Sequence, residues 1–173
     1  MVSHQFNIAR LPQLEEQLSL TYENLHEYEQ EIKLAAGADQ RIALRLRIKR
    51  EILPELERLE REYAALLDDT VSIDTLSESE AETALNSLIP AVTKFNDNLP
   101  ATVSNDEILI QIKKLQDLIT DSGKTAAAKL KIALPLLPTL VSYEFELDTE
   151  NALTNAWRGL KKLFRSKLSA NPN

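Results

Sequence analysis

The chain has 173 residues, 43% of them apolar, which suits one folded domain or two small helical lobes. It contains no cysteine, and this excludes disulfides, thiolate zinc sites and cysteine nucleophiles. The net charge of −7 weighs against nucleic-acid binding, and the presence of only three glycines favours helices over strand-rich folds, which need many tight turns.

No stretch of the sequence is long and apolar enough to predict a transmembrane helix. The longest uncharged apolar stretch covers residues 132–143, whereas a membrane span needs about 20 residues. Residues 1–7 are polar and lack the apolar core of a signal peptide. Together with the absence of cysteine, these features predict a cytoplasmic protein.

The first third of the chain carries the strongest pattern, an apolar heptad repeat. Its members are Leu11, Leu14, Leu18, Thr21, Leu25, Tyr28, Ile32 and Ala35. A second stripe follows a break at residues 37–39, with Leu44, Ile48, Ile52, Leu56, Leu59, Tyr63 and Leu66. The stripes predict helices over residues 11–36 and 39–67, joined by a glycine-containing turn into a long antiparallel hairpin. We expect Pro54 to bend the second helix.

Charged residues near the predicted turn favour this hairpin. Acidic residues end the first helix (Glu27, Glu29, Glu31) and basic residues open the second (Arg45, Arg47, Lys49). In an antiparallel pair these groups lie side by side, so we expect them to set the register.

Beyond a polar connection over residues 68–79, the sequence predicts further helices. Ser77 and Glu80 have the spacing of a capping box, so a helix is expected to start at Ser77 or Ser79. Ser104 is the expected cap of the next helix, whose apolar stripe is Ile108, Ile112, Leu115 and Ile119.

The last third of the chain predicts two more helical segments. A kinked, buried helix begins near Thr125 and crosses a proline-interrupted stretch. Asp148 or Thr149 is expected to cap a final helix that reaches Leu168. The fold predicted is an all-α bundle of five to six helices, with a hairpin over residues 1–68 and a bundle with a basic C-terminal helix over residues 69–173, forming one cooperative unit.

Two short runs leave an alternative open. Residues 42–48 and residues 141–147 alternate large apolar side chains with small or polar ones, which is a strand pattern. As strands among helices, these runs would have to pair with each other.

No residue constellation in the sequence specifies a chemistry, and we predict no catalytic residues, no metal site and no cofactor. Glu23 and His26 form one of the two Glu-x-x-His pairs that a di-iron site needs. They fall off the heptad repeat, however, and are better interpreted as surface residues. Paired carboxylates such as Glu15 and Glu16 have positions typical of a solvated helix face.

Two sets of residues are candidates for binding. On the heptad repeat, Leu18, Leu25 and Tyr28 are the expected partner contacts, although they can equally form the hairpin core. On the C-terminal helix, an apolar face with Trp157 and Phe164 adjoins a basic face with Arg158, Lys161, Lys162 and Arg165. Such a helix can bind an anionic membrane or an acidic partner, or pack its apolar face on the bundle.

The stretch ALPLLPTLVSYEFELDTE (residues 133–150), followed by Trp157, resembles a segment in helical modules of cyanobacterial signalling proteins. Residues 9–67 resemble the N-terminal helical hairpins of the same modules. These effector-associated domains accompany STAND-type NTPases, caspase-like proteases or TIR domains. The resemblance implies a non-enzymatic adaptor in bacterial signalling or conflict, with the effector on a separate protein.

The leading hypothesis is therefore a protein–protein interaction module that binds a partner or itself by helix packing. The alternative is a helical bundle that binds anionic lipid through its C-terminal basic helix.

Overall fold

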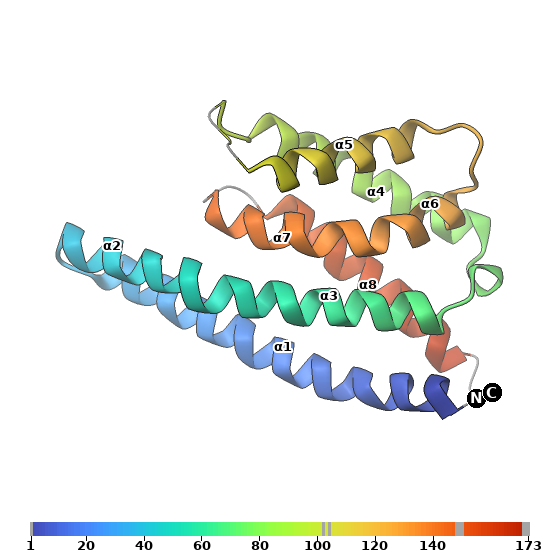
Figure 1. Ribbon diagram of the computed structural model, residues 1–173, viewed down its shortest axis with the longest axis horizontal. Helices are drawn as coiled ribbons and strands as arrows, with labels where there is room; N and C mark the ends of the chain where they lie inside the picture. The colour runs from blue at the N-terminus through green and yellow to red at the C-terminus, as the bar shows by residue number, and fades with distance from the viewer. Residues whose placement is uncertain (1, 102, 104, 148–150, 171–173) are drawn as a thin grey trace. The chain divides into compact units, whose positions relative to one another are not determined.

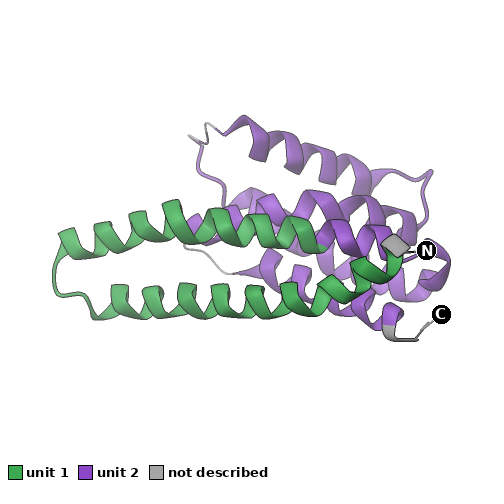
Figure 2. Ribbon diagram, turned by 60° about the horizontal axis from the view of Figure 1, so that its bottom comes forward, with its two compact units in different colours: residues 1–63 green, residues 64–173 purple. Residues whose placement is uncertain are grey.

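A computed structural model describes residues 2–101, 103, 105–147 and 151–170, and all regular structure in them is helical (Figure 1). The predicted all-α fold is confirmed. The chain divides into two compact units, residues 1–63 and 64–173 (Figure 2). A π-helical turn joins α2 to α3, and a 3-10 turn joins α6 to α7. When each joined pair is counted as one helix, the described part of the chain has six helices.

The first unit is an antiparallel helical hairpin (Figure 2). Helix α1 (Val2–Leu34) forms one arm and begins earlier than the repeat predicted. The other arm consists of α2 (Ala38–Arg47), a π-helical turn (Ile48–Ile52) and the start of α3 (Leu53–Thr70), which follow one another without a break. The predicted turn is present, with Gly37 as the N-cap residue of α2.

Both predicted stripes form the apolar interior of the hairpin arms. The buried members on α1 are Leu11, Leu14, Leu18, Leu25 and Ala35, and those on the other arm are Ile48, Ile52, Leu56, Leu59 and Tyr63. Thr21, Tyr28, Ile32, Leu44 and Leu66 are half-buried. The heptad repeat therefore marks the inner face of the hairpin.

The π-helical turn lies directly before Pro54, where a bend was expected. The backbone N–H of Leu53 donates to the carbonyl of Ile48, five residues earlier. Leu44, Ile48, Ile52 and Leu56 are spaced by four residues, and in an α-helix each such step overshoots a full turn by about 40°. The wider π turn corrects this drift, so Ile52 and Leu56 keep facing inward. Pro54 has no N–H to donate, which favours a break in the α-helical ladder at this place.

The two alternating runs are helical. Residues 42–47 lie in α2 and residues 141–146 lie in α7 (Leu137–Glu146), so the strand alternative is wrong. In α2 the apolar residues lie on two sides of one helix: Leu44 is half-buried, while Ile42 and Leu46 are exposed.

The second unit contains the end of α3, a short 3-10 turn (Ile73–Thr75) and five α-helices (Figure 1). These are α4 (Glu78–Asp97), α5 (Asp106–Thr120), α6 (Ala126–Ala133), α7 and α8 (Ala152–Ala170). A 3-10 turn, Leu134–Leu136, joins α6 to α7 at the proline-rich stretch, as expected for a kinked and buried helix. Helix α4 packs against α5, α6 and α8, while α7 packs against α5 and α8.

Local capping signals explain most helix starts in this unit. Ser77 and Glu80 form the predicted capping box, with the Ser77 Oγ accepting from the Glu80 N–H at 3.2 Å. The N-cap residue of α5 is Asn105, whose side chain accepts from the Glu107 N–H, while the predicted cap Ser104 lies outside the described residues. On α5, Leu118 is buried while the predicted Ile119 is half-buried. The expected caps Asp148 and Thr149 lie outside the described residues.

Candidate interaction surfaces

The three hairpin residues expected to bind a partner belong to the interior. Leu18 and Leu25 are 5% and 3% exposed, and Tyr28 is half-buried. The guanidinium of Arg47 lies 5.7 Å from the centre of the Tyr28 ring and donates to Glu51 on its own arm. The hydrogen bond to Glu51, with the nearby Tyr28, raises the pKa of Arg47. These contacts stabilise the hairpin near its turn and leave little of Leu18 or Leu25 for another molecule.

Tyrosine–carboxylate hydrogen bonds join α1 to α3. The Tyr22 hydroxyl donates to Glu60 at 2.7 Å, and the Tyr63 hydroxyl donates to Glu15 at 2.8 Å. Glu60 is only 1% exposed. Burial of a charged group is unfavourable unless it is hydrogen-bonded, so these bonds fix the register of the two arms.

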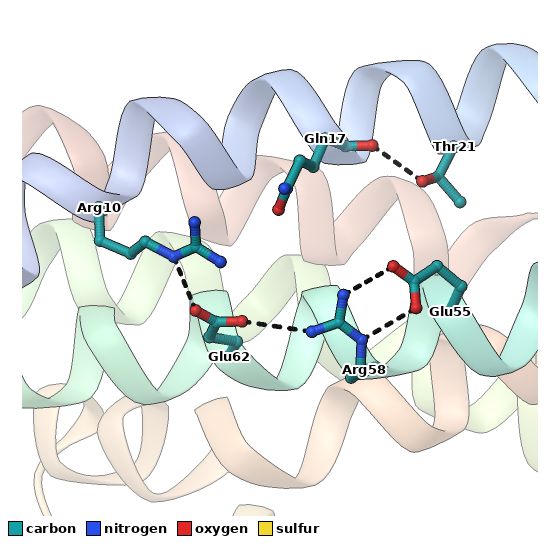
Figure 3. A network of polar contacts seen from close by, with 6 residues as sticks. All are labelled: Arg10, Gln17, Thr21, Glu55, Arg58 and Glu62. Carbon is teal, nitrogen blue, oxygen red and sulfur yellow. Dashed lines mark hydrogen bonds and ion pairs between the residues drawn. The ribbon is translucent and has the colours of Figure 1, made fainter.

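A charged network extends this link along the surface of the hairpin (Figure 3). Glu62 on α3 accepts from Arg10 on α1 at 2.9 Å and also pairs with Arg58, which forms two hydrogen bonds with Glu55. The Arg58 guanidinium lowers the pKa of the Glu55 carboxyl. The members are about half exposed, so the network adds orientation more than stability.

The hairpin also exposes large apolar side chains. Leu34 is 84% exposed, Leu20 55%, Ile42 53% and Leu46 41%. The sequence pattern had a signal for them, because all four are strongly apolar residues that fall between the positions of the two stripes. They are functional candidates that the heptad reasoning missed.

On α8, the residues expected to bind lipid or a partner are divided between the interior and the surface. Trp157 and Phe164 are 0% and 2% exposed. Arg158 and Lys162 are exposed, while Lys161 and Arg165 are half-buried. The Lys161 ammonium lies 5.5 Å from the centre of the Trp157 ring. In this arrangement α8 packs its apolar face within the protein, and its exposed residues are basic, small or polar: Asn155, Arg158, Gly159, Lys162 and Ser166.

Both ends of α8 are held by glutamates from other helices. The Glu144 carboxylate of α7 accepts from the backbone N–H groups of Leu153 and Thr154, each at 2.9 Å, and from the Thr154 hydroxyl. Near the other end, the Lys167 ammonium lies 2.6 Å from Glu80 of α4. The Lys167 contact, together with Ser77, lowers the pKa of Glu80. These contacts oppose detachment of α8.

A groove of about 460 Å³ lies between α4 and α8. Most of its walls are small side chains, and Leu88, Leu160 and Leu163 are also in contact with it. Among the lining residues only Glu80 is titratable, and it is engaged by Lys167 and Ser77. The groove is suited to burying an apolar side chain and not to acid–base chemistry.

Within the described ranges, no three His, Asp or Glu side chains are grouped so that they could hold a metal ion. None of the helices described is both long enough and apolar enough to cross a membrane. Comparisons of the chain with protein-family models, curated proteins and solved structures found no match.

Proposed function

We propose that this protein is a non-enzymatic helical adaptor that binds protein partners through the outer surface of its N-terminal hairpin. One observation carries the proposal: the hairpin completes its own apolar interior and still exposes Leu20, Leu34, Ile42 and Leu46. Ile42 and Leu46 lie one turn apart on α2, and exposed apolar residues that adjoin one another mark surfaces that other proteins cover.

The hairpin suits this role because its arms are held rigidly. The Tyr22–Glu60 and Tyr63–Glu15 hydrogen bonds fix the arms against each other, and a rigid surface loses little entropy when it binds. The resemblance of residues 9–67 and 133–150 to effector-associated modules is consistent with an adaptor in bacterial signalling, and we place it in the cytoplasm.

Lipid binding by α8 is the less favoured function. It would require Trp157 and Phe164, which are almost fully buried, to leave the core, and the contacts of Glu144 and Glu80 with α8 to break. The surface of α8 contributes charge without an exposed apolar face, which gives weak and salt-sensitive attraction to anionic lipid.

Proximity labelling in the cells that make the protein tests the adaptor proposal. We expect Leu20→Ser with Leu34→Ser to lose the neighbours labelled by the wild type, because both residues are exposed and their replacement removes apolar contact area. The control, Leu109→Ser with Ile110→Ser, changes two exposed apolar residues of α5. Retention of all labelled neighbours by the hairpin variant would refute the proposal.

A further inference from the structure

The outward face of α1 is a stripe of acidic and apolar residues. Leu20 and Leu34 each follow an inward-facing residue, Leu18 and Ile32, by two positions, which is about 200° around the helix. Three exposed glutamates, Glu16, Glu23 and Glu27, likewise lie two positions after a residue of the heptad repeat. The acidic stripe thus consists of Glu16, Leu20, Glu23, Glu27 and Leu34, all of them exposed.

The outward side of the other arm has the opposite charge. Ile42 and Leu46 flank the half-buried Leu44 by two positions, so they face away from α1. Arg45 and Lys49 complete a set spaced as neighbours on a helix surface, at i, i+3, i+4 and i+7. The basic stripe thus consists of Ile42, Arg45, Leu46 and Lys49, all of them exposed.

We propose, on the basis of the adaptor function above, that the partner of this hairpin is a second copy of the chain, with the acidic stripe of one copy packed against the basic stripe of the next. The two stripes match in kind. Each carries large aliphatic residues, which bury area, and charges of a single sign, which attract the other stripe. The shorter basic stripe covers Leu20 and the neighbouring glutamates but does not reach Leu34, which lies about 21 Å further along α1. The charges also reject the wrong pairing, because two acidic stripes or two basic stripes repel each other.

The geometry makes this contact heterologous. Within one hairpin the two stripes face away from each other, since each lies on the side of its helix opposite the shared interior. A copy bound at its acidic stripe therefore keeps its basic stripe open for a further copy. Such an interface adds copies in a row or closes into a ring and does not stop at a twofold dimer.

The contact is small. Residues 42–49 span about 12 Å of helix, so the buried area falls below that of stable complexes. We therefore expect weak association that depends on protein concentration and on salt. It gains strength where copies are held near one another.

Sedimentation equilibrium of the full chain across concentrations, at low and high salt, tests the proposal. At low salt the average mass should rise above the 19.5 kDa of one chain, and high salt should reverse the rise. The variants Glu23→Lys with Glu27→Lys, and Arg45→Glu with Lys49→Glu, should each weaken self-association by about tenfold or more. An equal mixture of the two should regain it, because each reversed stripe then meets a complementary one.

Matched controls change the same net charge elsewhere on exposed helix surfaces. Glu82→Lys with Asp117→Lys matches the first variant, and Lys113→Glu with Lys114→Glu matches the second. Both controls should associate like the wild type, and circular dichroism should show the same helix content in all variants. Controls that lose association as the stripe variants do would contradict the specific contact.

Two further results would overturn the proposal: a wild-type mass of one chain at every concentration at low salt, or a mixture that fails to regain association. Neither result bears on the adaptor function, because that rests on the loss of labelled neighbours in the Leu20 and Leu34 variant. Conversely, the adaptor function alone would be refuted if the Leu20 and Leu34 variant kept all labelled neighbours while the wild type showed the expected salt-dependent self-association.

Discussion

Glu144 on α7 caps the first turn of α8 by accepting from both the backbone N–H and the hydroxyl of Thr154, at 2.9 and 2.6 Å. The carboxylate is 2% exposed and also accepts from the Leu153 N–H. A helix start leaves N–H groups unpaired and carries partial positive charge. One buried side chain therefore satisfies several donors and complements the charge of the helix terminus.

Glu144→Gln should lower the free energy of unfolding by about 1–3 kcal/mol, because the amide replaces one acceptor oxygen with a donor and removes the charge. Urea unfolding followed by circular dichroism measures the change. Glu146→Gln serves as the control, since Glu146 is an exposed residue of the same helix. Equal effects of the two variants would contradict the capping role.

The pKa of Glu80, lowered by Lys167 and by Ser77, predicts a pH-dependent stability. The folded pKa lies below the ordinary value of 4.5, so the stabilisation is present above that value and is lost as the pH falls through the folded pKa. Glu80→Gln should be less stable than the wild type at neutral pH, and this difference should shrink in acid. Glu82→Gln, an exposed change on the same helix, should show no such trend.

Trp157 is the only tryptophan of the chain and is 0% exposed, which makes it a direct probe of α8. Its emission should be blue-shifted relative to the protein in urea and poorly quenched by acrylamide. Anionic liposomes should leave both properties unchanged, because the apolar face of α8 is buried. A salt-sensitive change with anionic but not neutral vesicles would instead favour the lipid-binding function.

Tyr22→Phe should cost about 0.5–2 kcal/mol of unfolding free energy, since it removes a hydrogen bond to the buried Glu60. Glu62→Gln, in the half-exposed network of Figure 3, should cost less than about 1 kcal/mol. Thermal or urea unfolding compares them at two salt concentrations. A larger effect for Glu62→Gln would show that the surface network, and not the buried bond, holds the arms together.

The sequence predicted the elements whose causes are local. The heptad repeat around Leu18 and Leu25 correctly marked a helical face, and Ser77 with Glu80 correctly marked a helix start, because both signals act over a few residues. The repeat did not distinguish an interior face from a binding face, since both need apolar residues at the same spacing. Burial decides between them, and it placed Leu18 and Leu25 inside.

The contacts that depend on packing could not be predicted. Glu144 reaches α8 from α7, and Glu78 of α4 accepts from the Ala126 N–H of α6 at 2.7 Å, 48 residues away. A single sequence does not show which glutamate becomes buried next to a helix end. The alternating runs at residues 42–48 and 141–147 were ambiguous for a related reason: in α2, one side of the helix faces the partner arm and the other carries exposed Ile42 and Leu46.

The π-helical turn at Ile48–Ile52 also sets the direction in which the tip of the hairpin faces. A π turn holds one residue more than the α-helical turn it replaces, so deleting one residue there would restore an unbroken α-helix. The α turn that replaces it still closes one full circle, so α2 would stay nearly in phase with α3, and Ile42 and Leu46 would still face away from α1. A single-codon deletion within Ile48–Ile52 would therefore shorten the arm without turning its apolar tip, whereas a deletion in the regular helix beyond the π turn would rotate α2 by about 100°.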